Sequence, residues 1–94
     1  MNWRIWKLNN ISFTYDAWQE YLYWQSIDKK TLKKINELLK DIRRNPYTGL
    51  GKPESLRKSN GMWSRRINDK DRLVYKINND EIIVYQCKGH YDDK

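Results

Sequence analysis

Hydrophobic residues in the N-terminal half of the chain recur at a helical spacing, most clearly after residue 28. A single apolar stripe is formed there by Leu32, Ile35, Leu38, Leu39 and Ile42. Asp28 precedes this stripe as a candidate N-cap, and Pro46 follows it as a helix breaker. We therefore predict an amphipathic helix between Asp28 and Pro46.

A second helix is predicted immediately before this one. The segment Ile11–Tyr15 alternates enough for a short strand, and Asp16 is a candidate N-cap for a helix that runs to about Ile27. Four aromatic residues lie within that helix, namely Trp18, Tyr21, Tyr23 and Trp24. Because one helix face cannot bury all four, we expect most of them to pack in the core and the surplus to contact a protein partner.

The C-terminal half shows the alternation typical of strands. Met62–Asn68 and Arg72–Ile77 flank a tight NDKD turn, and Glu81–Cys87 follows an NND turn. Residues 45–54 hold two Gly and two Pro and predict a loop. The order of elements predicts a single α+β domain over residues 1–94. Two N-terminal helices are expected to pack on one face of a small, mainly antiparallel twisted sheet, and the other face is expected to stay open.

Basic residues are concentrated in the stretch from Gly51 to Tyr75. This stretch holds seven Lys or Arg against three Asp or Glu, and the whole chain has a formal net charge of +7. Because strands hold side chains at fixed positions, these cations are expected to form a fixed basic surface. Polyanions, and nucleic acids above all, are the natural partners of such a surface.

The composition excludes several kinds of site. One cysteine, Cys87, rules out an internal disulfide, and a single histidine, His90, argues against a zinc site of the usual ligands. The sequence lacks a phosphate-binding glycine loop, a CxxC pair and an HExxH helix, so we expect neither a metal nor a cofactor. No apolar run reaches the length of a signal-peptide core or a membrane span, which predicts a cytoplasmic protein without membrane association.

Glu54, Arg72 and His90 are the residues that could carry chemistry. Metal-free RNA cleavage needs a base for the 2′-hydroxyl, an acid for the leaving 5′-oxygen and cations for the charge on the phosphorane. Glu54 could be the base and His90 the acid, and the forked guanidinium groups of Arg66 and Arg72 match phosphate oxygens. Each signal is weak when taken singly. On these residues alone, a non-catalytic nucleic-acid- or protein-binding module is favoured over a ribonuclease.

Four segments of the chain together resemble the YoeB/Txe branch of the RelE-superfamily toxins. They are DAWQEYLYW, KKINELLKDIRRNPYTGLGKPESL, WSRRINDKDRLVY and the near-terminal HY, and the resemblance runs from about Ile11 to Tyr91. It implies a RelE/YoeB-like fold and the toxin of a type II toxin–antitoxin module. It also implies a metal-independent endoribonuclease that cleaves mRNA in the A site of the 70S ribosome. The implied partners are a YefM/Phd-type antitoxin that covers the basic face and operator DNA, bound only by the toxin–antitoxin complex.

The same resemblance assigns roles to single residues. Glu54 is the expected general base, Arg72 the expected transition-state stabiliser and His90 the expected general acid. Tyr91 is expected to orient the substrate or to stack on it, and Asp71 stands where the family usually has a histidine. RNA contacts are expected from Lys52, Arg57, Arg65 and Arg66.

Two alternatives from other functional classes stay open on the same scaffold. One is a ParE-like toxin that inhibits gyrase by binding, against which the acid–base pair argues. The other is a non-catalytic nucleic-acid-binding corepressor. Residues 1–10 have no clear counterpart in the family, and two interpretations stay open for them: an extra leader outside the fold, or an extra edge segment of the sheet. Residues 92–94 extend beyond the family's usual end as a short tail. The sequence does not fix the oligomeric state, so a homodimer stays open as well.

Overall fold

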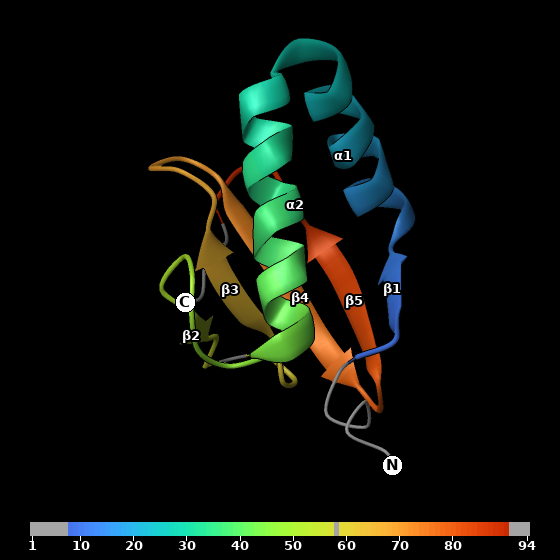
Figure 1. Cartoon of the computed structure of the whole chain (residues 1–94), viewed down its shortest axis with the longest axis vertical. Helices are drawn as coiled ribbons and strands as arrows, with labels where there is room; N and C mark the ends of the chain where they lie inside the picture. Colours follow the sequence, from blue (N-terminus) through green and yellow to red (C-terminus); the bar gives the residue numbers. More distant parts are fainter. Residues whose placement is uncertain (1–7, 58, 91–94) are drawn as a thin grey trace.

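The structure, a computed structural model, describes residues 8–57 and 59–90. Within these ranges the elements follow one another as β1 (Asn10–Phe13), α1 (Tyr15–Ile27), α2 (Lys29–Arg44), β2 (Glu54–Ser55), β3 (Trp63–Arg66), β4 (Arg72–Asn78) and β5 (Glu81–Gln86). Both helices lie on one face of the sheet (Figure 1). The predicted α+β fold, with two N-terminal helices on a small, mainly antiparallel sheet, is confirmed.

The sheet places the first strand beside the last one. The strand order is β1-β5-β4-β3-β2. β1 runs parallel to β5, with Ile11 opposite Ile82 and Phe13 opposite Val84, and the other neighbouring strands are antiparallel. β1 ends at Phe13, before the predicted end at Tyr15, because the chain turns into helix α1 at that point.

Side chains cap the start of both helices. Thr14 caps α1, where its hydroxyl accepts a hydrogen bond from the N–H of Ala17 at 3.1 Å, so the predicted cap Asp16 is wrong. Asp16 lies instead in the first turn, where its charge suits the helix dipole. Asp28 caps α2 as predicted. It accepts from the hydroxyl of Thr31 at 2.8 Å and from the Thr31 N–H at 3.2 Å, and these two bonds lower the pKa of Asp28.

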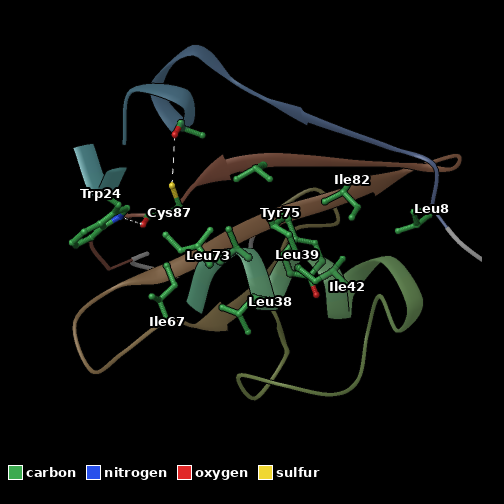
Figure 2. Packing of buried hydrophobic residues seen from close by; sticks show 13 residues of the cluster. Leu8, Trp24, Leu38, Leu39, Ile42, Ile67, Leu73, Tyr75, Ile82 and Cys87 are labelled. Atoms are coloured by element: carbon green, nitrogen blue, oxygen red, sulfur yellow. Dashed lines mark hydrogen bonds between the residues drawn. The ribbon is translucent and has the colours of Figure 1, made fainter. Parts of the chain in front are cut away.

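The apolar stripe predicted for α2 forms the centre of the core. Ile35, Leu38 and Ile42 are fully buried. The sheet side of this cluster consists mainly of Ile67, Leu73, Tyr75, Ile82 and Val84 (Figure 2). The helix ends at Arg44, before Pro46, as predicted. Burial of this stripe joins the helical layer to the sheet.

The aromatic residues of α1 divide between the core and the surface. Trp24 is buried, and Tyr21 packs against the core while its hydroxyl donates to the side-chain oxygen of Asn36 at 2.8 Å. Trp18 and Tyr23 are 43% and 44% exposed. The prediction that most of the four pack in the core is therefore wrong, because only half of them do so.

The face of the sheet opposite the helices carries basic side chains of β4 on either side of the buried Val74. Leu73 and Tyr75 of β4 belong to the core. Because successive strand residues point to opposite faces, Arg72, Val74 and Lys76 lie on the other face of β4. We call this side of the sheet the open face.

The short strand β2 was not predicted from the sequence. Glu54 pairs with Ser64 and Ser55 pairs with Trp63, both in antiparallel register. The prediction that residues 45–54 form a loop is therefore wrong at Glu54, which lies on an edge strand of the sheet. Sheet pairing gives this carboxylate a defined position that a loop would not.

Candidate functional site

Strand pairing sets the positions of the candidate residues on the open face. Glu54 lies opposite Ser64, Ser64 opposite Val74, and Val74 opposite Gln86. Paired residues point to the same face of a sheet. This row therefore crosses four strands, with Glu54 at one end and Gln86 at the other.

A pair of arginines lies on the same face, two residues further along β3 and β4. Arg66 of β3 is opposite Arg72 of β4, two residues away from the row that begins at Glu54. Neighbouring strands lie about 4.8 Å apart and rise about 3.3 Å per residue, so the Cα atoms of Glu54 and Arg72 are about 12 Å apart. Long side chains at this separation can approach one phosphodiester from two sides.

The guanidinium of Arg72 is held by the turn that precedes β4. Its Nη1 donates to the carbonyl oxygen of Asn68 at 2.7 Å and to the carbonyl oxygens of Asp69 and Asp71 at 3.3 and 3.2 Å. These three bonds use neither Nε nor Nη2. Both of those atoms can therefore donate to an anion on the open face.

The segment that carries His90 returns to the start of β4. The N–H of Arg72 donates to the carbonyl oxygen of Gly89 at 3.0 Å, and the N–H of Gly89 donates to Oδ1 of Asp71 at 2.7 Å. Nε2 of Gln86 donates to the carbonyl oxygens of Gly89 and His90 at 3.0 and 3.1 Å. These bonds bring the backbone before His90 beside that of Arg72, and His90 is exposed there.

Helix α1 anchors the start of the same segment. The N–H of Cys87 donates to Oε1 of Glu20 at 2.7 Å. Nε1 of Trp24 donates to the carbonyl oxygen of Cys87 at 2.8 Å, as Figure 2 shows. The thiol of Cys87 is fully buried and donates to the carbonyl oxygen of Ala17 at 3.6 Å. Burial raises the pKa of this thiol to about 12, so it stays protonated at neutral pH.

Arg65 does not belong to the open face, and the prediction that it contacts RNA is wrong. Its side chain is fully buried, its Nη1 pairs with Asp41 at 2.6 Å, and its Nε donates to the hydroxyl of Tyr75 at 3.2 Å. The other acceptors are the backbone carbonyls of Asn45, Thr48 and Leu50. Adjacent strand residues point to opposite faces, so of the two arginines in WSRR only Arg66 is exposed.

The ion pair between the buried Arg65 and the partly exposed Asp41 holds the loop that leads to the open face. Burial alone would raise the pKa of Asp41, but hydrogen bonds from Arg65 and from the N–H of Leu50 outweigh that effect, so the pKa lies below its ordinary value. The hydroxyl of Tyr75 donates to the carbonyl oxygen of Pro46 at 2.6 Å. The loop after α2 is thereby bonded to α2 through Asp41 and to the sheet through Arg65 and Tyr75.

Gly51 makes the last close contact before β2. Its φ is +79°, and a Cβ there would lie only 3.0 Å from the carbonyl oxygen of Arg66. Its own carbonyl oxygen accepts from the N–H of Arg66 at 2.7 Å. The contact fixes the chain beside β3 immediately before Lys52 and Glu54, which are both exposed.

The predicted site residues differ in where the structure places them. The backbone of Arg72 is bonded to Gly89, directly before His90, and Glu54 and Arg66 are exposed on the open face. Lys52 and Arg57 are exposed before and after β2, respectively. Tyr91 lies outside the described residues.

Sequence reasoning missed the residues that hold the His90 segment. Gln86 and Glu20 were not singled out, although a polar residue directly after the apolar run IIVY was a usable signal. Asp71 was noted only as a departure from a motif. Hydrogen bonds between a side chain and a distant backbone leave no periodic trace in a sequence, which explains why they were missed.

The candidate residues line none of three hollows on the described surface. These hollows have volumes of about 510, 460 and 500 Å³, and none of them is bordered by Glu54, Arg72 or His90. Within residues 8–57 and 59–90, no group of three or more His, Cys, Asp or Glu is arranged to hold a metal ion. No helix in this part of the chain is long and apolar enough to cross a membrane.

Comparison with known proteins matches most of the chain. The family described as "YoeB-like toxin of bacterial type II toxin-antitoxin system" matches residues 13–91. Toxin YoeB from Escherichia coli strain K12 is 51% identical over 77 residues, which cover 81% of this chain and 92% of that protein. Toxin YoeB from Streptomyces coelicolor is 46% identical over 82 residues, which cover 86% and 98%, respectively.

Solved structures agree with this match. The YoeB dimer from Staphylococcus aureus has 52% identity and a TM-score of 0.83, over 89% of this chain and 99% of that chain. The toxin in the heterotetrameric YoeB-YefM toxin–antitoxin complex from Staphylococcus aureus has 52% identity and a TM-score of 0.80, over 87% and 97%. The archaeal RelE-RelB complex from Pyrococcus horikoshii OT3 has a TM-score of 0.68 at 15% identity, over 87% and 94%, which shows a shared fold alone.

Proposed function

The chain belongs to the YoeB-like toxins of bacterial type II toxin–antitoxin systems, and from this premise we propose that it is an endoribonuclease that cleaves translated mRNA in the ribosomal A site. One observation carries the proposal: Arg72 and the His90 segment are bonded together on the face where Glu54 is exposed. A carboxylate, guanidinium groups and an imidazole are the groups that metal-free RNA cleavage requires.

The reaction is proposed to proceed in one displacement at phosphorus. Glu54 takes the proton of the 2′-hydroxyl, and the 2′-oxygen attacks the phosphorus. Arg72 and Arg66 stabilise the negative charge on the phosphorane oxygens. His90 gives a proton to the 5′-oxygen as its bond to phosphorus breaks. The products are a 2′,3′-cyclic phosphate and a 5′-hydroxyl, so neither a metal ion nor a cofactor is needed to balance the reaction.

The other predicted residues take supporting roles in this proposal. Lys52 and Arg57 contact the RNA backbone beside β2, where both are exposed. Tyr91 stacks on a base or orients the substrate. The 70S ribosome supplies the mRNA in a fixed conformation, which removes much of the entropic cost of alignment.

The partners are proposed by analogy with the relatives. A YefM-type antitoxin is proposed to cover the open face and to neutralise the toxin in the cytoplasm. The YoeB-YefM complex from Staphylococcus aureus supports YefM as the kind of partner. Operator DNA is bound by the toxin–antitoxin complex alone. A homodimer is included in the proposal because a YoeB dimer is known from Staphylococcus aureus.

The proposal is tested by mapping the ends of a defined mRNA in a reconstituted translation reaction. Cuts are expected within codons in the A site, and their ends should be a 2′,3′-cyclic phosphate and a 5′-hydroxyl. Glu54→Gln, Arg72→Ala and His90→Gln should each slow cleavage by about 10²–10⁴-fold. The matched controls Glu37→Gln and Arg44→Ala change exposed residues of α2 and should retain activity.

Three results would reject the proposal. Undiminished cleavage by Arg72→Ala and His90→Gln would remove the assigned site. Intact mRNA together with inhibition of gyrase supercoiling would identify a ParE-like toxin. Intact mRNA together with unchanged cell growth on induction would identify a non-catalytic corepressor.

A further inference from the structure

Asp71 is a buried carboxylate that reaches across to another segment of the chain. It is 8% exposed and lies in the turn between β3 and β4. Its backbone carbonyl accepts from the N–H of Ile67 at 3.0 Å, and its own N–H donates to Oδ1 of Asn68 at 2.7 Å. The turn therefore fixes the backbone of Asp71. Its side chain is directed instead at Gly89, 18 residues further along.

Gly89 is held through both of its backbone polar groups. Its N–H donates to Oδ1 of Asp71 at 2.7 Å, and its carbonyl oxygen accepts from the N–H of Arg72 at 3.0 Å. Residues 71 and 72 are adjacent, so a single dipeptide grips the residue immediately before His90. The same dipeptide carries the guanidinium proposed to stabilise the phosphorane.

Packing does not hold Gly89 in this place. It has no side chain, and a Cβ built on it would meet no atom within 4 Å. Its φ of +86° is one that few other residues adopt. The position of this backbone therefore depends on its hydrogen bonds, and the bond to a carboxylate is expected to be about twice as strong as one between neutral groups.

We propose that Asp71 is a positioning residue, whose carboxylate holds the Gly89 amide and thereby sets His90 in register with Arg72. The role in catalysis rests on the proposed function, whereas the hydrogen bond and its effect on the backbone do not. Asp71 touches no substrate in this proposal. It acts on cleavage only through the placement of His90, and a small displacement of a catalytic group can cost about 10²-fold in rate.

The test compares two variants of Asp71 with a matched control. Asp71→Ala removes the acceptor, Asp71→Asn keeps an acceptor oxygen without the charge, and Asp69→Ala changes an exposed carboxylate of the same turn. In Asp71→Ala, kcat for mRNA cleavage on programmed ribosomes should fall about 10–100-fold, with KM changed less than about twofold. Asp71→Asn should recover most of the loss, and Asp69→Ala should resemble the unaltered protein.

A readout that does not depend on activity is amide hydrogen exchange followed by NMR. The Gly89 amide should be protected in the unaltered protein and should exchange at least about tenfold faster in Asp71→Ala, accompanied by a shift of the His90 ring resonances. An unprotected Gly89 amide in the unaltered protein overturns the proposal even if Asp71→Ala does not fold. An unchanged exchange rate of the Gly89 amide in Asp71→Ala also overturns the proposal.

The two proposals fail in different ways. If the unaltered protein cuts no mRNA, the proposed function fails, and the Gly89 and His90 resonances alone decide the positioning role. If it cuts mRNA and Asp71→Ala cuts equally well, the positioning role fails and the proposed function stands. A loss of kcat that Asp71→Asn does not recover at all also overturns positioning by this hydrogen bond.

Discussion

Arg65 and Arg66 are adjacent in β3 and carry the same charge, but they have different surroundings. Arg65 is buried between the sheet and α2, where a carboxylate, a hydroxyl and three carbonyl oxygens accept its hydrogen bonds. Arg66 is exposed on the open face. The charge of a residue thus says little about its role until the face of the strand is known, because burial of a cation is tolerated only with complete pairing.

Replacing these two arginines by methionine should separate stability from RNA binding. Arg65→Met leaves Asp41 without its buried partner and should lower the free energy of unfolding by about 3–5 kcal/mol, measured by urea denaturation. Arg66→Met should leave this free energy within about 0.5 kcal/mol and should instead reduce the log–log salt dependence of binding to single-stranded RNA by about 0.7. Equal loss of stability in both variants would contradict the assignment of Arg65 to the buried face and Arg66 to the open face of β3.

Cys87 provides a second prediction for a single residue. Because burial raises the pKa of its thiol to about 12, the thiol should react slowly with a disulfide reagent at pH 8 in the folded protein and rapidly in guanidinium chloride. The raised pKa gives stability that is full below the ordinary thiol pKa of about 8.5 and is lost as the pH rises towards 12. The Cys87→Ala variant should not show this part of the loss of stability at alkaline pH. Fast labelling of the folded protein would show that the thiol is accessible.

Helix α1 holds β5 and the segment that leads to His90 through its N-terminal cap and two of its side chains. Its cap, Thr14, also donates its backbone N–H to the carbonyl oxygen of Val84 at 3.0 Å. Further along the helix, Glu20 and Trp24 hold the backbone of Cys87. The helix thus fixes β5 and the segment that follows it, so loosening its start should also affect the distant His90 segment.

The N-cap assignment can be checked by a pair of alanine substitutions. Thr14→Ala removes the hydroxyl that accepts from the N–H of Ala17 and should lower the free energy of unfolding by about 1 kcal/mol. Asp16→Ala, in the first turn of the same helix, removes only a favourable charge and should cost about 0.5 kcal/mol or less. Thermal unfolding followed by circular dichroism measures both. A larger loss for Asp16→Ala would mean that Asp16 is the cap after all.

At the scale of the whole molecule, a network of polar side chains joins helix α2 to the sheet. It adds to the contacts of the apolar core between the same two layers. Asp41 comes from α2, Arg65 from β3 and Tyr75 from β4, and their partners lie in the loop that leads to β2. Positive charge is spread over both layers. Helix α2 alone carries seven Lys or Arg against two acids, so the basic surface is not confined to the candidate site.

This network predicts a specific response to acid. The pKa of Asp41 is lower in the folded protein, so its contribution to stability is present above the unfolded pKa of about 3.9 and is lost as the pH falls through the folded value. Asp41→Asn should therefore be less stable than the unaltered protein at pH 7, and the difference should shrink below about pH 4. Urea unfolding at several pH values measures this. If the difference in unfolding free energy between Asp41→Asn and the unaltered protein is constant from pH 7 to pH 3, the ionised Asp41–Arg65 pair is excluded as its source.

What the sequence could predict was mostly local. The stripe and the cap of α2 and the two tight turns were predicted because neighbouring residues determine them. The predicted N-cap of α1 was wrong. Thr and Asp are both favourable N-cap residues, and the local backbone conformation determines that Thr14 rather than Asp16 takes this position. The burial of Arg65 and the strand at Glu54 depend on which distant element packs against which face, and no local pattern records that choice. Glu54, Arg72 and His90 were grouped from their chemistry and assigned roles through the resemblance to a family, and those roles stay predictions.

The parallel pairing of β1 with β5 has a consequence for the order of events during synthesis. Asn9 at the start of this edge bonds to Asp80, 71 residues later. A nascent chain therefore cannot complete this sheet until β5 has left the exit tunnel, and contacts of such long range are formed late. The segment that carries His90 follows β5 and is made after it. We therefore expect the protein, which we propose to cut messages on the ribosome, to lack its assembled site until β5 and the His90 segment have been translated.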